Sequence, residues 1–185
     1  MVSEPTIRRA TIHDLPGTYR VCLGTGDAGA DGTGHYRDPD LLGHVFVGPY
    51  VVGSPELALV VTDGAGVEGY LLAAADTRAF EAWAERDWWP PLRARYPLGP
   101  DGRIPAEVPA SDAWIVELIH APALAPEAVV ADYPAHLHID LLPPVRGRGF
   151  GRALVERCLA DLRARGYTVE EGAHFLRGNR TPRRA

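Results

Sequence analysis

One short segment, residues 142–154 (LPPVRGRGFGRAL), has residue types that suit binding of a phosphate group. Alternating glycines let a backbone turn tightly, so that successive N–H groups can point into one hollow. Arginine guanidinium groups are planar multi-donor cations that neutralise phosphate oxygens. If a helix follows, its N-terminus adds roughly half a positive charge. The candidate anion-binding residues are Arg146, Gly147, Arg148, Gly149, Phe150, Gly151 and Arg152.

Three kinds of anion-binding loop can be compared with this segment. A Walker-type phosphate loop needs a lysine, and all 19 basic residues of this chain are arginine. A dinucleotide-binding fingerprint needs GxGxxG after the first strand, whereas here the spacing is GxGxG, late in the chain, with Arg152 in place of the last glycine. The pattern that fits is Arg-x-x-Gly-x-Gly between a strand and a helix. The alternative interpretation is that residues 142–154 form a surface loop whose arginines are solvated and bind no ligand.

Acid–base groups precede the loop. His136, His138 and Asp140 alternate along an apolar segment, so in a strand their side chains would face the same side of a sheet. Such a row could relay a proton, hold a metal ion, or brace the sheet as a buried hydrogen-bonded row. We take His138 and Asp140 as the candidate catalytic residues and assign no metal. Other candidate bases are Glu117, His120 and Asp76.

A strand and a helix must position these residues. The pattern predicts a strand at 135–142 and a helix from about Gly149 to Arg165, with Gly166 as its stop. The apolar residues of the helix form one stripe, which places Cys158 in the core and not in the role of a nucleophile. The stripe consists of Leu154, Val155, Cys158, Leu159 and Leu162.

The first half of the chain reads as strands and helices in alternation. We expect a strand at 6–10, a helix capped by Asp14 with Pro16 in its first turn, a Gly/Asp-rich loop at 24–40, and a hairpin at 56–76 that turns at DGAG. Residues 111–121 could form a strand or a helix, and a cap at Ser111 or Asp112 favours the helix.

Residues 77–134 read as a largely helical insertion. Its first helix should stop at Pro90-Pro91. The insertion contains Trp83, Trp88 and Trp89, which either cover a sheet face or form an aromatic wall over a pocket.

Composition indicates a single domain of 185 residues, 46% hydrophobic and 23% charged. A net charge of −5 does not favour nucleic acid or an anionic membrane as partner. The cysteines Cys22 and Cys158 form no CxxC pair, which argues against a zinc site and fits a cytoplasmic setting. The N-terminus lacks the apolar region of a signal peptide, and no apolar run reaches the ~18 residues of a membrane helix.

The strand, glycine-rich loop and helix at 135–165, together with the first strand and helix, resemble the corresponding segments of the GCN5-related N-acetyltransferases. LHIDLLPPVRGRGFGRALVERCLADL is similar to their acetyl-CoA motif, and TIRRATIHDLPGTYRVC to their first strand and helix. SPELALVVTDGAGVEGYLLAAADTRAF and YPAHLHIDLLP resemble, more narrowly, the acetyltransferase-like domain of protein O-GlcNAcase and its free-standing bacterial relatives. The resemblance implies an α/β (α+β) fold. Its central sheet would be mixed but mostly antiparallel, splayed at the acetyl-CoA strand, with helices on both faces.

The resemblance also implies a cofactor and a reaction. A bulge at Ile139–Leu142 would open the strand edge to the pantetheine arm of acetyl-CoA, and the N–H of Leu141 would polarise the thioester carbonyl. The coenzyme-binding residues are then Ile139, Asp140, Leu141 and Leu142, together with Arg146 to Arg152. The reaction is direct transfer of an acetyl group to an amine of a small molecule or a protein.

The chain departs from the family at its end. Many members carry a tyrosine on a fourth helix that protonates the leaving thiolate, whereas this chain reaches Asn179 and ends without one. We therefore expect the C-terminal helix and last strand to be missing, or to be completed by a partner in a homodimer. Tyr133 or Tyr167 would be substitute acids, but both are expected in the core or at a rim. The alternative functions are a catalytically silent acetyl-CoA-binding module and, less consistent with the glycine spacing, a dinucleotide-binding oxidoreductase domain.

Overall fold

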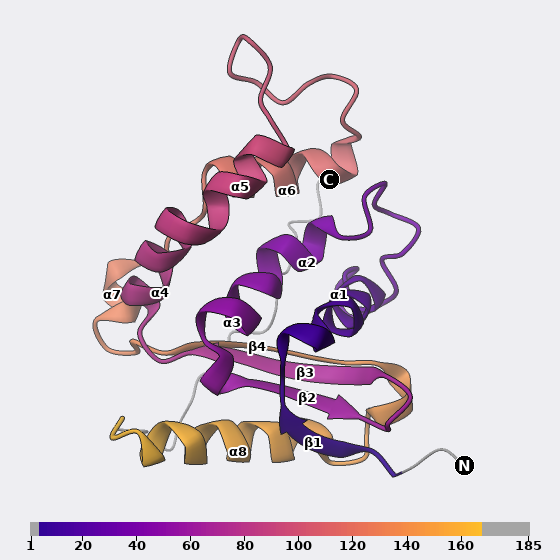
Figure 1. Cartoon of the computed structure of the whole chain (residues 1–185), viewed down its shortest axis with the longest axis vertical. Helices are drawn as coiled ribbons and strands as arrows, with labels where there is room; N and C mark the ends of the chain where they lie inside the picture. The colour runs from indigo at the N-terminus through magenta and orange to yellow at the C-terminus, as the bar shows by residue number, and fades with distance from the viewer. Residues whose placement is uncertain (1–3, 168–185) are drawn as a thin grey trace.

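The computed structural model describes residues 4–167, which form a four-stranded sheet with helices on both faces (Figure 1). The strands are antiparallel and follow one another in chain order across the sheet. They are β1 (Thr6–Arg9), β2 (Ala58–Thr62), β3 (Val67–Ala74) and β4 (His136–Leu141). The expected fold class is confirmed, and the turn DGAG joins β2 to β3 as predicted.

The expected bulge in β4 is not present. β4 pairs with β3 without a shift from His136 to Leu141, and the N–H of Leu142 continues the ladder with a 2.8 Å bond to the carbonyl of Glu68. A Cβ added at Gly69, opposite Leu141, would stand 2.4 Å from that leucine's side chain, so the glycine lets the two strands lie close together. The shift in register lies instead in β2, between Val61 and Thr62.

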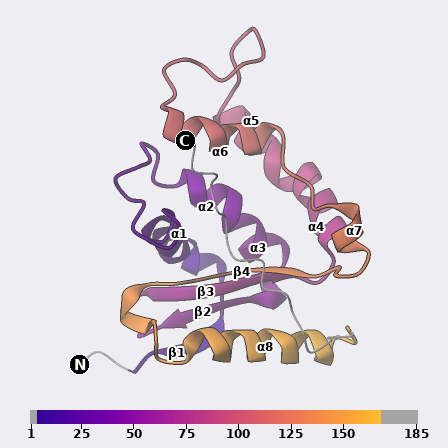
Figure 2. The ribbon, with the colours of Figure 1, turned by 180° about the vertical axis from the view of Figure 1, so that it is seen from behind.

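Helices cover the two faces unequally, as the front and back views show (Figures 1 and 2). α8 lies along one face, and the other α-helices lie on the opposite side. The helices are α1 (Leu15–Gly24), α2 (Leu41–Phe46), α3 (Gly48–Gly53), α4 (Thr77–Trp83), α5 (Trp89–Arg95), α6 (Ala110–His120), α7 (Glu127–Val130) and α8 (Phe150–Ala164). Short turns are η1 (Ile12–Asp14), η2 (Pro55–Leu57), η3 (Ala84–Trp88) and η4 (Pro143–Val145).

Strand alternation divides the core into two apolar clusters, one on each face of the sheet. On the α8 face, Leu154, Cys158 and Leu162 pack against the sheet, and fully burying one such leucine contributes about 1.5–3 kcal/mol. Cys158 is 1% exposed, so its expected place in the core is confirmed. On the other face, α1 and α3 pack on β3, and α2 and α6 extend the same cluster, which includes Val60, Tyr70 and Leu72. His136, His138 and Asp140 belong to this second face.

The tryptophan-rich insertion differs from the expectation at its prolines. Pro90 and Pro91 do not end the helical segment; they occupy the first turn of α5, after the π-helical turn η3. Because the first N–H groups of a helix have no partner within it, proline is tolerated there.

Nor do the tryptophans cover the sheet directly. Trp83 and Trp88 pack against Gly53 and Gly48 of α3, so closely that an added Cβ would lie 2.3 and 2.5 Å from their rings.

Some sequence expectations fall outside the described residues. They include the missing C-terminal helix and last strand, expected after Asn179, and the completion of the fold by a partner in a homodimer. Among residues 4–167, no helix is both long and apolar enough to cross a membrane.

Candidate functional site

The glycine-rich loop leaves β4 and enters α8 through two left-handed glycines. Gly147 has φ of 70° and Gly149 has φ of 86°, and an added Cβ at either would meet no other atom within 4 Å. Gly149 precedes the first residue of α8. Within residues 4–167, no backbone carbonyl accepts a hydrogen bond from the N–H of Gly147, Arg148 or Gly149. Together with the first amides of α8, these donors line an open and electropositive surface.

The three arginines play different parts in the loop. Arg146 fastens it: its Nε donates to the carbonyl of Leu141 at 2.6 Å, and its Nη2 to the carbonyl of Gly29 at 2.8 Å. Arg148 lies over the ring of Phe150, 5.6 Å from its centroid. Arg152 pairs with Glu156 at 2.7 Å, but with 85% of its side chain exposed this pair is weak. All three guanidinium groups are exposed enough to meet an anion.

The outer edge of β4 offers main-chain groups beside the loop. Residues along an antiparallel strand direct their N–H and C=O alternately to one neighbour and the other. The bond from Leu142 to Glu68 fixes this alternation, so Leu142 and Asp140 point toward β3 while Leu141 and Ile139 point outward. No other strand among the described residues pairs with this edge. The N–H of Leu141 and the main chain of Ile139 are therefore open for the predicted role, whereas the main chain of Asp140 and Leu142 is engaged with β3 and the carbonyl of Leu141 with Arg146.

The polar row of β4 is half-buried under α3 and α4. The hydroxyl of Tyr50 lies 2.9 Å from Nε2 of His136 and 3.0 Å from Nε2 of His138. Thr77 Oγ1 lies 2.7 Å from Nδ1 of His136. Side chains of α3 and α4 thus hold both histidines of the row by hydrogen bonds.

The surroundings shift the acid–base properties of this row. Burial, with the neighbouring His136 as a smaller cause, lowers the pKa of His138 to about 4. Burial also lowers the pKa of His136, against the opposing charge of Glu81. The pKa of Asp140 is raised by burial, although hydrogen bonds from Tyr70 and Thr25 counteract the shift. Both imidazoles are therefore neutral near pH 7, in the form that accepts a proton.

Aromatic side chains from distant elements flank His138. The ring of Phe46 in α2 lies 6.4 Å from that of His138 and 6.2 Å from that of Trp114 in α6. Phe46 and Trp114 are both half-buried. The tryptophan on this side of His138 is therefore Trp114, which also lies in the insertion at 77–134 but is not one of the three tryptophans expected there. No local pattern pointed to Phe46 or Tyr50, because the residues they contact lie far from them along the chain.

The other candidate bases do not join the β4 row. Glu117 is exposed on α6, His120 bonds to the carbonyl of Tyr96 at 2.7 Å, and Asp76 caps α4 by accepting from the N–H of Ala79. Tyr133 and Tyr167 are both exposed, at 55% and 43%.

Metal and thiol chemistry receive no support from residues 4–167. Nowhere in this range do three or more His, Cys, Asp or Glu side chains gather to hold a metal ion. Both cysteines are buried, and burial raises the pKa of the Cys158 thiol to about 11.

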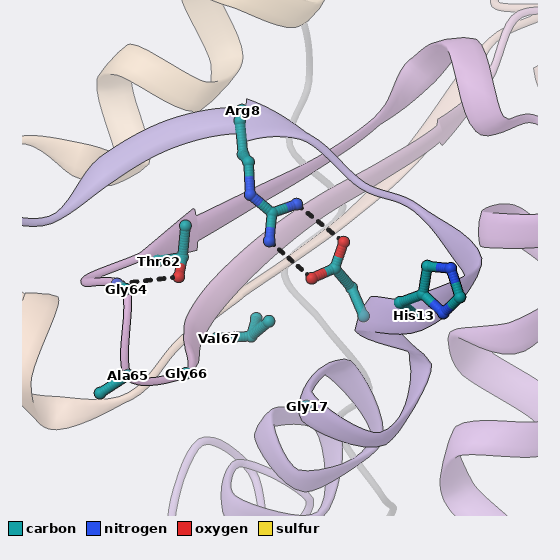
Figure 3. Close-up of a pocket in the computed structure, with 9 residues that line it drawn as sticks. Arg8, His13, Gly17, Thr62, Gly64, Ala65, Gly66 and Val67 are labelled. Carbon is teal, nitrogen blue, oxygen red and sulfur yellow. Dashed lines mark hydrogen bonds and ion pairs between the residues drawn. The ribbon is translucent and has the colours of Figure 1, made fainter.

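A hollow of about 270 Å³ lies at the β2–β3 turn (Figure 3). Its lining includes Arg8, His13, Asp14 and the turn residues Gly64 to Val67. Arg8 and Asp14 satisfy one another through two 2.7 Å hydrogen bonds, so the hollow presents no free charged pair to a ligand. It contains none of the predicted site residues.

Comparisons with known proteins agree with this arrangement. No family model matches the chain. Protein O-GlcNAcase of Rattus norvegicus is 25% identical over 161 residues, which are 87% of this chain but 17% of that protein. The crystal structure of SsHAT is 44% identical, with a TM-score of 0.77 over 88% of this chain and 79% of that one. An agmatine N-acetyltransferase mutant structure aligns more weakly, with 16% identity and a TM-score of 0.46.

The chain therefore spans about a sixth of the curated relative that it matches, and most of SsHAT. The strand, glycine loop and helix that carry the family motif occur in the expected order in β4, residues 142–149 and α8. The chain belongs to the same family as SsHAT and is a distant homologue of protein O-GlcNAcase.

Proposed function

We propose that this protein binds acetyl-CoA along the outer edge of β4 and transfers the acetyl group to an amine. The observation that supports this most directly is the loop between β4 and α8. Its two left-handed glycines leave open space beside three N–H groups that have no backbone acceptor among residues 4–167. Unpaired N–H donors of this kind suit a diphosphate, and Arg146, Arg148 and Arg152 lie in the same loop and the first turn of α8.

The adjoining strand edge suits the remainder of the coenzyme. The outward N–H and C=O of Ile139 and the outward N–H of Leu141 would pair with the amides of a pantetheine arm, in the manner of an added strand, while the carbonyl of Leu141 stays bonded to Arg146. The N–H of Leu141 would then polarise the thioester carbonyl. The side chains of Leu141 and Ile139 pack toward α8 and hold this edge in place.

The acceptor would approach from the side of the sheet on which His138, Phe46 and Trp114 lie. There the amine nitrogen would attack the acetyl carbon as the carbon–sulfur bond breaks, and a neutral group would take its proton. His138 and Asp140 are the acid–base candidates. The aromatic surface suits an amine with an apolar body, in a small molecule or in a protein side chain.

Two measurements test this proposal. Acetyl-CoA should raise the melting temperature of the protein, and NAD should not; the opposite result would overturn it. Release of free thiol from acetyl-CoA should then be followed across a panel of small amines and amine-bearing peptides. Binding of acetyl-CoA without thiol release on any acceptor would favour the catalytically silent module.

A further inference from the structure

Four side chains form a continuous hydrogen-bonded chain behind the candidate site. It begins at His138 Nε2, passes through the hydroxyl of Tyr50 at 3.0 Å, and reaches Nε2 of His136 at 2.9 Å. His136 Nδ1 continues to Thr77 Oγ1 at 2.7 Å. Thr77 Oγ1 lies 2.7 Å from the carbonyl oxygen of Pro134. Tyr50 of α3 thus bridges two residues of β4, His138 and His136, and Thr77 at the start of α4 bonds to the second of them.

The carbonyl at the end fixes the direction of every hydrogen. A carbonyl only accepts, so Thr77 donates its one hydroxyl hydrogen to Pro134 and must accept from Nδ1–H of His136. Neutral His136 then has a bare Nε2, to which Tyr50 donates. The hydroxyl of Tyr50 has no second hydrogen, so it accepts from Nε2–H of His138. The remaining nitrogen, Nδ1 of His138, therefore carries a free lone pair.

The nitrogen that carries this free lone pair is not fully buried. No residue among 4–167 forms a hydrogen bond with Nδ1 of His138, and this nitrogen is not among the fully buried polar atoms that lack a partner. The His138 ring is half-buried beside Phe46. An incoming amine could therefore reach the one acceptor that the chain leaves open.

Of the two histidines in this hydrogen-bonded chain, His136 is the better place for a positive charge. Glu81 on α4 raises the pKa of His136 against the effect of burial, and its charge also acts on Tyr50. The pKa of His138, by contrast, is depressed by burial and by His136. Thr77 can accept from Nδ1–H of a charged His136 without rearrangement. Phe80 stacks on Tyr50 with centroids 4.5 Å apart and holds the bridging ring in place.

We propose that His138, Tyr50 and His136 form a proton relay that takes a proton at Nδ1 of His138 and holds the positive charge on His136. When Nδ1 of His138 gains the proton, its Nε2–H passes to the oxygen of Tyr50, and the hydrogen of Tyr50 passes to Nε2 of His136. His138 ends neutral in its other tautomer, Tyr50 stays neutral, and His136 becomes an imidazolium that donates to Tyr50 and Thr77.

In the proposed function, the proton comes from the attacking amine. The thiolate that leaves as the carbon–sulfur bond breaks needs one proton, and the reverse of the same steps returns it. The relay rests on the proposed function only for the identity of this donor and acceptor. The direction of the hydrogens and the place of the charge follow from the chain of contacts alone.

Nitrogen NMR of the histidine rings tests the relay without any substrate. Near neutral pH, His136 should show the Nδ1–H tautomer and His138 the Nε2–H tautomer. As the pH falls, His136 should become the imidazolium while His138 switches to Nδ1–H at the same midpoint. The reverse tautomers, or a charged His138 beside an unchanged His136, would overturn the relay.

Two pairs of variants extend this test. In Tyr50→Phe, charging of His136 should no longer change the tautomer of His138; a switch that persists would contradict the bridging role of Tyr50. Thr77→Val should release the tautomer of His136, and the matched Thr77→Ser, which keeps the hydroxyl, should preserve it. Tyr70→Phe, on the same face of the sheet but outside the chain, should leave both tautomers unchanged.

A kinetic measurement separates the relay from the proposed function. If an acceptor is found, Tyr50→Phe should lower kcat by about 10²-fold, the lower range for general acid–base catalysis, with acetyl-CoA affinity unchanged. An unaffected kcat would overturn the relay and leave the proposed function intact. If no amine is acetylated but the NMR result holds, the proposed function fails while the relay stands.

Discussion

The Tyr70 hydroxyl donates a 2.6 Å hydrogen bond to Oδ2 of Asp140, the residue directly opposite it on the neighbouring strand. Tyr70 is 1% exposed, so this bond is buried in the apolar cluster between the sheet and α1. It gives one candidate catalytic residue a fixed donor and leaves the other, His138, in a separate network with Tyr50. The acid–base groups of β4 thus fall into two independent sets.

The first prediction concerns Tyr70→Phe. Burial raises the pKa of Asp140 and the bond from Tyr70 lowers it, so the variant should raise that pKa further. Below the pKa of Asp140 the variant loses only a bond to a neutral carboxyl. Above it, a buried carboxylate loses its donor, and the free energy of unfolding should fall by about 1–3 kcal/mol. Urea unfolding at pH 4 and pH 7 should show that the variant loses more unfolding free energy, relative to the unaltered protein, at pH 7. Equal losses at the two pH values would contradict the prediction.

The second prediction concerns Asp14, which joins β1 to the start of α1. Its carboxylate accepts two 2.7 Å bonds from Arg8, and this partner, with the N–H and hydroxyl of Thr11, lowers the pKa of Asp14 to about 2 despite the opposing effect of burial. Stabilisation from a lowered pKa is present above the ordinary pKa of about 4 and is lost as the pH falls through about 2.

We therefore expect Asp14→Asn to destabilise the protein at pH 6 and much less at pH 2. The loss at pH 6 should be roughly 1–2 kcal/mol, since solvent screens the half-exposed Arg8. Chemical unfolding at the two pH values measures it. The control is Asp132→Asn, which changes an exposed carboxylate. The difference in unfolding free energy between pH 6 and pH 2 should be the same in this variant as in the unaltered protein.

Local sequence signals predicted the framework of the site. Alternation identified β4, and the apolar stripe with Gly149 before it identified α8 within about one residue. Contacts made by tertiary packing left no such signal. Tyr50 is 86 residues from His136, and Thr77 is 59 residues from it, so no spacing along the chain could place them together. The regular pairing of β4 was missed for the same reason, since it depends on Gly69 in another strand.

The third prediction follows from that glycine. Gly69→Ala would place a Cβ 2.4 Å from Leu141 Cδ2 and 3.0 Å from the carbonyl oxygen of Asp140. We expect a loss of about 1–3 kcal/mol in unfolding free energy, the range for an overpacked core. The displaced end of β4 should also weaken acetyl-CoA binding, measured by calorimetry.

Gly66→Ala is the matched control for this variant. It lies in the same hairpin, and its added Cβ would come no closer than 3.6 Å to another atom. If Gly66→Ala proved as harmful as Gly69→Ala, close approach of β4 could not be the cause.

The last prediction concerns the loop that we propose to bind the diphosphate. Gly149→Glu would place a carboxylate among the N–H donors that we assign to the diphosphate, at a residue where φ is 86°. Acetyl-CoA affinity should fall at least about tenfold, that is by about 1.4 kcal/mol. Backbone strain of roughly 1–2 kcal/mol would accompany it, because a side chain is disfavoured in the left-handed region.

Gly102→Glu separates strain from charge. Gly102 also has a positive φ, of 73°, with open space beside it, but it lies in the exposed loop before α6. Both variants should lose similar stability, whereas only Gly149→Glu should lose affinity for acetyl-CoA in calorimetry. Unchanged affinity in a folded Gly149→Glu protein would show that the diphosphate binds elsewhere, because a carboxylate at the start of α8 cannot share those amides with another anion.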